Sequence, residues 1–289
     1  MQLQFPQAVL DLNVTRIMGV LNVTPDSFSD GGLYAAHGAA VERALTLAEE
    51  GADIIDIGGE STRPGAQPVG VAEELDRVIG VIEALRKSSD VPISVDTSKP
   101  EVMRAAIAAG ASMVNDVCAL AHADLTELAD ANVAVCLMHM QGEPRTMQTQ
   151  PHYDDVVTEV REYLLKRAAA CREAGISADR IVIDPGFGFG KTLEHNIALL
   201  HTLDDLAGGG YPVLVGLSRK SMIPALMANA GRSGAAAADA PAPPSERLGG
   251  SVTLAFYAAA KGAHIVRVHD VHETLEALTI RQSLDIAFQ

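Results

Sequence analysis

The sequence has little cysteine, little positive charge and no long apolar run. Its three cysteines are widely spaced and form no Cys-x-x-Cys pair, which argues against a zinc knuckle or a disulfide framework. Lys and Arg number 22 against 37 Asp and Glu, so the formal net charge of -15 offers no basic surface for nucleic acid or anionic lipid. No segment approaches the roughly 18 apolar residues of a membrane span, and no secretion signal is evident. We therefore expect a soluble cytoplasmic protein with no nucleic-acid or membrane partner.

Apolar residues make up 48% of the 289 positions, enough for one large core and unlike a disordered chain. Short β-branched runs alternate with longer helical stretches, which indicates a parallel sheet. The expected strands are residues 17–21, 53–57, 92–95, 113–115, 133–138, 181–183, 213–215 and 264–268. The clearest expected helices are residues 39–50, 72–87, 100–109, 153–174 and 271–287.

Eight strand-helix units fit a closed (β/α)8 barrel, a TIM barrel of the α/β class, with residues 1–289 forming a single domain. Residues 2–13 alternate weakly and precede the first unit, so we expect a short β-hairpin covering the barrel floor. Residues 231–244 are almost entirely Gly, Ala, Ser and Pro without apolar periodicity. That Ala/Pro-rich insertion is expected to form a surface loop.

Polar residues follow every expected strand, where a TIM barrel carries its active site. Taken singly, an Asp or Asn at such a position is better explained as a turn residue or a helix cap than as a functional residue. Because turn propensity does not select one face of a barrel, the joint pattern favours function. The strand-end residues are Asn22, 60–64, Asp96, 115–116, His139, 184–190, 216–220 and 267–270.

Asp96, Asn115, Asp184 and Lys220 are expected to converge at the barrel mouth around a flat, hydrogen-bonding ring. Carboxylates complement the paired N–H donors of a 2-amino-4-oxo heterocycle, and an asparagine complements its mixed edge. The lysine would then meet the ring carbonyl or a ring nitrogen. Taken singly, Asp184 also fits an ordinary turn and Lys220 an exposed helix start.

Two basic residues beyond the last strand, Arg267 and His269, lie where TIM barrels commonly bind phosphate. A structural salt bridge is the alternative interpretation. Asn22 offers one neutral oxygen, which suits Mg2+ that takes most of its ligands from substrate phosphates and water. Met138 and Phe189 are expected to contact the faces of the bound ring.

The run Gly-Phe-Gly-Phe-Gly-Lys-Thr at residues 186–192 imitates the end of a phosphate-binding P-loop but lacks its four-residue interval. We expect it to shape the pocket instead. His139 is not part of a His-Glu-x-x-His motif, so zinc hydrolysis finds no support. Residues 23–38 and 59–70 have glycines near their ends and are either lids or simply long loops.

Two long motifs carry a family resemblance. Residues 18–32, Met-Gly-Val-Leu-Asn-Val-Thr-Pro-Asp-Ser-Phe-Ser-Asp-Gly-Gly, resemble the first signature of the bacterial dihydropteroate synthase family. Residues 56–65, Asp-Ile-Gly-Gly-Glu-Ser-Thr-Arg-Pro-Gly, resemble the second. Shorter matches at 94–97, 115–116, 137–142, 184–186, 218–221 and 267–270 extend the resemblance over nearly the whole chain.

The resemblance implies a folate-synthesis transferase that joins 6-hydroxymethyl-7,8-dihydropterin diphosphate to p-aminobenzoate. The products are 7,8-dihydropteroate and diphosphate, with Mg2+ bridging to the diphosphate. It also implies a homodimer that pairs through helices near the end of the chain. The 231–244 stretch is longer than the usual connection, which leaves the exact interface open.

The residues and the resemblance together assign two sets of site residues. The catalytic set is Asn22, which is also the metal ligand, with Asp30, Arg63, Asp96, Lys220, Arg267 and His269. The substrate-binding set is Phe28, Thr62, Pro64, Asp96, Asn115, Met138, Asp184, Phe189, Gly216, Ser218, Lys220, Arg267 and His269. Within these sets, Phe28, Thr62, Pro64 and Ser218 would frame p-aminobenzoate, while Asp30 and Arg63 would complete the closed loops.

Two competing functions remain open on the sequence. A corrinoid-dependent methyltransferase also holds a folate with Asp, Asn and Asp on a barrel, but it needs no diphosphate site, so the groups at 218–220 and 267–269 favour the synthase. A catalytically silent relative that only binds pterin is the second alternative. Both long motifs are intact, which argues against a silent relative.

Overall fold

A computed structural model describes residues 1–24, 32–61, 65–143, 146–230 and 243–287. Eight parallel strands form its central sheet and confirm each predicted strand to within one residue at either end. They are β3 (Arg16–Asn22), β4 (Ile54–Gly58), β5 (Ile93–Asp96), β6 (Met113–Asp116), β7 (Ala134–Met138), β8 (Ile181–Asp184), β9 (Leu214–Val215) and β10 (Ile265–Val268). The surface loop predicted at 231–244 falls almost entirely outside the described residues.

The sheet closes into a barrel, which confirms the predicted fold class. Its strands run in the order β8-β7-β6-β5-β4-β3-β10-β9, so each strand lies beside its neighbours in the sequence. Between the two ends of this order, Ile183 and Val213 pair in parallel. The amide of Ile183 donates to the carbonyl of Pro212 at 2.9 Å across the same junction. Short parallel strands joined by helices are the arrangement that such a barrel requires.

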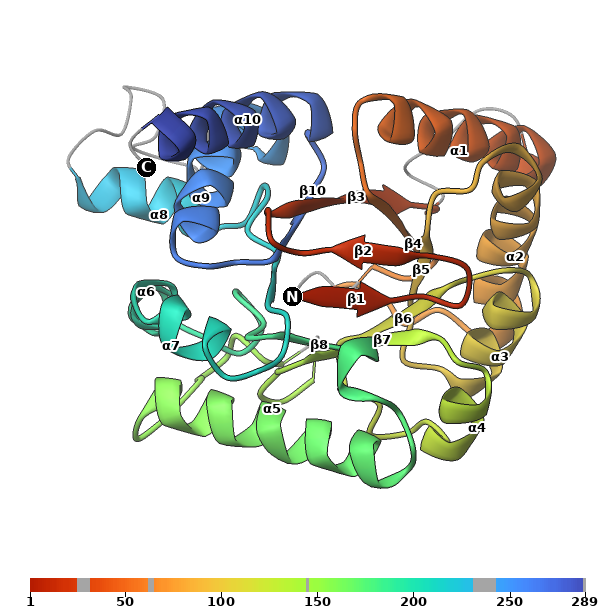
Figure 1. Cartoon of the computed structure of the whole chain (residues 1–289), viewed down its shortest axis with the longest axis horizontal. Coiled ribbons are helices and arrows are strands. Elements are labelled where there is room, and N and C mark those ends of the chain that lie inside the picture. The colour runs from red at the N-terminus through yellow and green to blue at the C-terminus, as the bar shows by residue number, and fades with distance from the viewer. Residues whose placement is uncertain (25–31, 62–64, 144–145, 231–242, 288–289) are drawn as a thin grey trace.

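Helices surround the barrel (Figure 1). They are α1 (Gly32–Glu49), α2 (Val71–Ser88), α3 (Pro100–Ala108), α4 (Leu125–Asp130), α5 (Val156–Glu173), α6 (Leu193–His201), α7 (Leu203–Ala207), α8 (Met222–Asn229), α9 (Leu248–Ala260) and α10 (Val271–Ala287), with 3-10 turns η2 (Ala178–Arg180) and η3 (Pro244–Glu246). Helix α5 begins three residues after the predicted Tyr153 because Asp155 caps it, accepting from the amides of Val157 and Thr158. Helix α1 begins earlier than the predicted start at residue 39. Glycines at 32 and 38 have low helix propensity, so the sequence pattern did not indicate the first turns of this helix.

The predicted N-terminal hairpin is present and closes the barrel floor. Strands β1 (Gln2–Gln4) and β2 (Val9–Asp11) pair antiparallel, and Figure 1 shows them lying across one end of the barrel. Leu3, Phe5 and Leu12 share one buried cluster with inward side chains of the barrel strands. Burial of this apolar surface holds the hairpin in place and excludes water from the floor.

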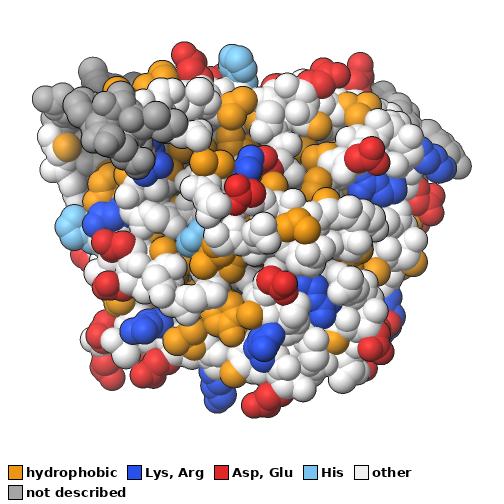
Figure 2. All heavy atoms as spheres, in the orientation of Figure 1, with side chains coloured by type: hydrophobic (Ala, Val, Ile, Leu, Met, Phe, Trp, Pro, Cys, Tyr) orange, Lys and Arg blue, Asp and Glu red, His pale blue; other side chains and the backbone are white. Residues whose placement is uncertain are grey.

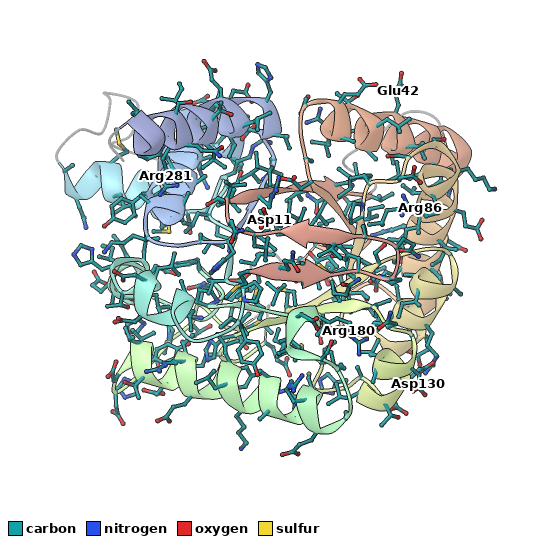
Figure 3. All side chains as sticks on the ribbon, viewed as in Figure 1. Asp11, Glu42, Arg86, Asp130, Arg180 and Arg281 are labelled. Carbon is teal, nitrogen blue, oxygen red and sulfur yellow. The ribbon has the colours of Figure 1, made fainter. Side chains whose placement is uncertain are left out.

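Arginines bind carbonyl groups around this floor, near the hairpin (Figure 3). Buried Arg180 donates to the carbonyls of Ala129 at 3.3 Å and Gly175 at 3.3 Å. Arg86 donates to the carbonyl of Val91 at 2.9 Å. Such bonds satisfy carbonyl groups left at the ends of helices and strands. The floor is therefore a structural face of the barrel. In a TIM barrel the N-terminal ends of the strands serve stability, and the active site lies at the opposite end.

Charged side chains on the floor face are interspersed, and Figure 2 shows no gathering of Lys and Arg there. None of the helices in the described ranges is both long and apolar enough to cross a membrane.

Candidate active site

The barrel interior changes from apolar to polar within two residues along four strands. The apolar members, buried in the floor cluster, are Ile54, Met113, Val182 and Ile265. Because side chains alternate along a strand, residues two positions further on face the same interior space. These polar members are Asp56, Asn115, Asp184 and Arg267. The sequence thus places charge immediately above an apolar floor, at the C-terminal end of the strands.

Arg267 lies at the centre of this polar layer. Its Nε donates to Oδ2 of Asp56 at 2.6 Å, and its Nη2 donates to Oδ2 of Asp96 at 2.7 Å. Asn115 donates through Nδ2 to the same Asp56 oxygen at 3.1 Å. Arg267 thus binds the predicted residue Asp96 directly, and it meets Asn115 through Asp56, a carboxylate that the sequence argument did not include.

Burial sets the electrostatics of this group. It raises the pKa of Asp96 to about 7, although the Arg267 guanidinium acts to lower it. Burial alone would lower the pKa of Arg267, but Asp56 and Asp96 reverse that effect and raise it. Asp56 is fully buried, and its Oδ1 has no hydrogen-bond partner among the described residues. The pocket therefore holds carboxylate oxygens with capacity for a donor.

Asp184, the last residue of β8, and Lys220, on the segment after β9, form a second part of the pocket. Asp184 accepts from the amide of Gly186 at 2.7 Å, and burial raises its pKa while Lys220 acts to lower it. Burial lowers the pKa of Lys220 to about 8, with Asp184 acting in the opposite direction. The Lys220 ammonium donates to the carbonyl of Phe187 and lies 4.5 Å from the centroid of the Phe189 ring.

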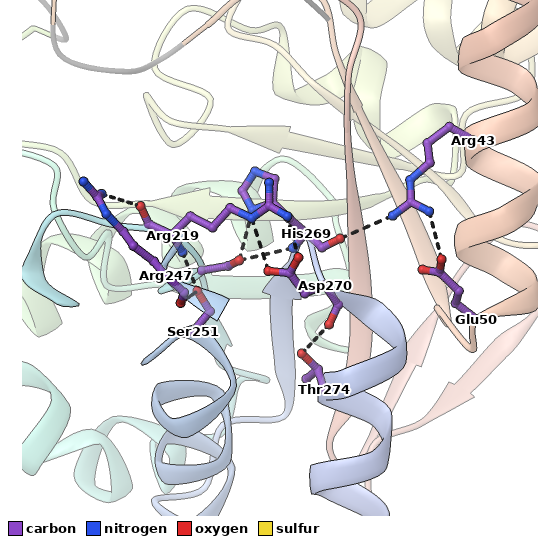
Figure 4. A network of polar contacts seen from close by, with 9 residues as sticks. Arg43, Glu50, Arg219, Arg247, Ser251, His269, Asp270 and Thr274 are labelled. Atoms are coloured by element: carbon purple, nitrogen blue, oxygen red, sulfur yellow. Dashed lines mark hydrogen bonds and ion pairs between the residues drawn. The ribbon is translucent and has the colours of Figure 1, made fainter. Parts of the chain in front are cut away.

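Ser218 and His269 meet beyond β9 and β10. The Ser218 hydroxyl lies 3.0 Å from Nδ1 of His269 and accepts from the His269 amide at 3.2 Å. The neighbouring Arg219 is paired with Asp270 beside the site (Figure 4). The Arg219 backbone is left-handed with a φ of 60°, a conformation that side chains other than glycine rarely adopt.

The other described site residues also lie at the C-terminal ends of strands. Asn22 ends β3 beside Gly58, and Gly58 in turn lies beside Asp96 in the sheet. Buried Met138 ends β7 opposite Asp184. Gly216 follows β9, and a Cβ there would lie 3.9 Å from the Cβ of Arg267. Five predicted residues fall outside the described ranges: Phe28, Asp30, Thr62, Arg63 and Pro64.

An ion-paired cluster that the sequence argument missed stands beside this pocket. Lys99 pairs with both Glu60 and Glu74, and Glu60 also accepts from the amide of Val69 at 3.1 Å. Burial would lower the pKa of Lys99, but the two glutamates raise it. The cluster holds together residues that precede and follow the 61–68 segment in the sequence. In the sequence, the signal for this cluster was Glu74, a glutamate on the apolar face of α2.

The arrangement can bind a planar ring with several N–H donors and, nearby, an anion. Comparison with known proteins agrees with this chemistry. The model of the family described as pterin binding enzyme matches residues 18–269. A dihydropteroate synthase from Escherichia coli strain K12 is 51% identical over 272 residues, which span 94% of this chain and 92% of that relative.

Solved structures agree in fold as well as in sequence. The Xanthomonas albilineans dihydropteroate synthase with 4-aminobenzoic acid superposes with a TM-score of 0.87 at 51% identity, covering 98% of both chains. The same enzyme in complex with 7,8-dihydropteroate gives a TM-score of 0.84 at 48% identity and covers 99% of both chains. With a matching family model, close relatives and the same fold, the chain belongs to the dihydropteroate synthase family of pterin-binding transferases.

Proposed function

We propose that this chain condenses 6-hydroxymethyl-7,8-dihydropterin diphosphate with p-aminobenzoate, releasing diphosphate and forming 7,8-dihydropteroate. The observation that carries the proposal is the set of buried Asp96, Asn115 and Asp184 with half-buried Lys220 at one end of the barrel. The related Xanthomonas structures contain the second substrate and the product of this reaction. A corrinoid-dependent methyltransferase would have no use for phosphate-binding residues at 267–269.

The pterin ring is assigned to the two carboxylates, Asp96 and Asp184, with Asn115 on the mixed edge of the ring. Lys220 donates to the ring carbonyl or a ring nitrogen. Met138 and Phe189 contact the ring faces, and Gly216 is assigned to the same pocket beside Arg267. A pocket built this way rejects rings without matching donors, because buried carboxylates would stay unpaired.

The reaction starts with loss of the diphosphate. The bond between the pterin methylene carbon and the diphosphate oxygen breaks, and its electron pair leaves with the diphosphate. The electron-rich dihydropterin shares the positive charge, which Asp96 and Asp184 stabilise, while Arg267 and His269 stabilise the departing anion. The amine nitrogen of p-aminobenzoate then forms the C–N bond and loses a proton. No covalent bond to the enzyme is required.

The p-aminobenzoate site is assigned to Ser218 with three residues outside the described ranges, Phe28, Thr62 and Pro64. Asp30 and Arg63 are assigned to the loops that complete the site. Ser218 supports this placement because its hydroxyl contacts His269, the residue assigned to the diphosphate. An amine bound there would approach the methylene carbon beside the leaving group.

Mg2+ is proposed as the cofactor, with Asn22 as its protein ligand. Within the described ranges, no group of three His, Cys, Asp or Glu side chains is placed to hold a metal. One neutral amide oxygen fits only a cation that takes its other ligands from substrate and water, as Mg2+ does with phosphates. When bound, the ion would supply positive charge to the leaving diphosphate.

A diphosphate-release assay tests the proposed function. With pterin diphosphate, Mg2+ and p-aminobenzoate, we expect release of diphosphate and formation of dihydropteroate in equal amounts. Omitting p-aminobenzoate should remove dihydropteroate formation. A chain that binds pterin diphosphate in calorimetry but releases no diphosphate under any of these conditions is a silent relative, and the proposed activity is then wrong.

The activity should depend on pH through Asp96 and Lys220. As the pH rises through about 7, Asp96 loses its proton and can stabilise the pterin cation, so kcat/KM for pterin diphosphate should increase. As the pH rises through about 8, Lys220 loses its proton and one of its donors, so kcat/KM should decrease. The measurement is a pH profile of kcat/KM. Lys220→Arg should move the alkaline fall in kcat/KM to higher pH. If the fall stays at the same pH, a group other than Lys220 causes it.

We also propose that the chain forms a homodimer through α8, α9 and α10, which lie together on one side of the barrel (Figure 1). Exposed large apolar side chains gather on these helices: Met227, Leu248, Phe256, Tyr257, Leu275, Ile280 and Leu284. Exposed apolar surface of this kind marks a protein interface. The arrangement supports the pairing mode that the family resemblance implies.

Ile280→Arg should shift the dimer towards monomer, because a charge placed in an apolar interface loses its water without gaining a partner. Light scattering after size-exclusion chromatography measures the mass. Glu83→Arg, at an exposed position on α2, is the matched control and should leave the mass unchanged. A wild-type chain that is monomeric at high micromolar concentration contradicts the proposal.

A further inference from the structure

The lysine that follows the glycine-rich loop lies in the protein interior, although its sequence imitates the end of a P-loop. Lys191 is 3% exposed. Its ammonium lies 2.9 Å from Nδ1 of His139 and donates to the carbonyls of Gly186 at 3.0 Å and Phe189 at 3.1 Å. The carbonyl of His139 itself is 3.4 Å away. The ammonium is thus surrounded by acceptors from the segments after β7 and β8, which already take up its donors.

The loop needs such a donor because of its backbone shape. Gly186 and Gly190 have φ of 70° and 62°, and an added Cβ would meet the carbonyl of His139 at 1.9 Å and of Gln141 at 2.3 Å. The loop backbone therefore packs directly on residues 139–141 and turns several carbonyls towards one point. Buried carbonyls require donors, and an ammonium group supplies three from a single atom.

The same loop supplies the pterin pocket. The amide of Gly186 donates to Asp184, the carbonyl of Phe187 accepts from Lys220, and the ring of Phe189 lies 4.5 Å from the Lys220 ammonium. These contacts depend on where the loop backbone lies. A group that fixes the loop backbone therefore also fixes Lys220 and the ring that lies beside it.

We propose that Lys191 is a positioning residue for the pterin pocket, with His139 as its partner. Its ammonium holds residues 185–190 against the end of β7, and so places the Phe187 carbonyl and the Phe189 ring around Lys220. Burial lowers the pKa of His139 to about 3, and Lys191 acts in the same direction. The imidazole is therefore neutral, and in the tautomer protonated at Nε2 its Nδ1 accepts from the lysine. Burial lowers the pKa of Lys191 to about 7, while Asp184 acts to keep it protonated. The identity of the ligand rests on the proposed function, whereas the anchoring of the loop does not.

Lys191→Met tests the proposal against Lys166→Met, an exposed position on α5. Hydrogen-deuterium exchange should become at least about tenfold faster for the amides of residues 185–191 in Lys191→Met only. The KM for pterin diphosphate should rise about tenfold, with the KM for p-aminobenzoate changed less than about twofold. Unchanged exchange overturns the proposal. Faster exchange with an unchanged pterin KM also overturns it, because the lysine then has a structural role alone.

A second pair of variants decides the matter where Lys191→Met does not fold. His139→Leu removes the acceptor, whereas the Oδ1 of His139→Asn keeps an acceptor near the position of Nδ1. Leucine should accelerate exchange of residues 185–191 and raise the pterin KM, and asparagine should restore both. Equal effects of the two variants contradict the proposal. If the wild-type chain makes no dihydropteroate, the proposed function fails, and the exchange rates still decide whether Lys191 anchors the loop.

Discussion

Lys220→Ala should lower kcat/KM for pterin diphosphate by at least about a hundredfold while the barrel remains folded. The ammonium of Lys220 is a positive charge that favours the ionised form of Asp184, and it also donates to the carbonyl of Phe187. Without it, the pterin ring loses a charged hydrogen bond, and the buried carboxylate loses the cation that favours its ionised form. Both effects weaken pterin binding most in the transition state, when positive charge develops on the pterin. Steady-state kinetics measures the change.

Circular dichroism and a melting curve accompany this measurement to show that the variant is folded. Lys220 follows its strand and is only half-buried, so its removal should leave the fold intact. We expect the same spectrum as the wild type. Lys166→Ala, on the exposed face of α5, is the control for removal of a lysine and should retain full activity. Near-normal turnover by Lys220→Ala would remove this residue from the proposed mechanism. A loss confined to the KM of p-aminobenzoate would place it in the other substrate site.

The barrel and most of the pocket could be predicted because both depend on local patterns. Short β-branched runs set the strands, and parallel strands that alternate with helices bring their ends to one face. Asp96, Asn115 and Asp184 were predicted from that rule alone, and the structure places all three in the buried interior at that end.

Asp56 could not be predicted in the same way. It stands inside the run Ile-Ile-Asp-Ile, and strands of a parallel barrel are covered on both faces. The sequence therefore does not say which alternate residues point into the barrel. Only the register of the sheet shows that Asp56 follows Ile54 on the inward side.

Arg267 illustrates a second limit. Its position at the end of the last strand predicted a diphosphate contact, but its pairing with Asp56 and Asp96 joins residues 211 and 171 positions apart. No local pattern encodes such a pairing. Lys191 is comparable, because its ammonium is buried against His139, which lies 52 positions away in the sequence.

Arg267→Met should destabilise the fold by about 3–5 kcal/mol, in addition to removing activity. The guanidinium is the cation paired with fully buried Asp56 and with Asp96, so its loss leaves two carboxylates without compensation. The Arg267 side chain is 22% exposed, so water screens part of this effect and the lower end of the range is expected. A drop of several degrees in Tm, measured at pH 8, corresponds to such a change.

The pH dependence of this loss identifies its cause. Burial raises the pKa of Asp96 in the folded chain above its value in the unfolded chain, and the shift grows when Arg267 no longer opposes it, so the folded variant binds this proton more tightly. Lowering the pH from 8 towards 5 should therefore reduce the deficit relative to wild type. Adding Asp56→Asn and Asp96→Asn to Arg267→Met should recover stability at pH 8, because neutral amides replace the unpaired charges. A deficit that is independent of pH and unrescued by the two amides would show that Arg267 contributes through packing instead.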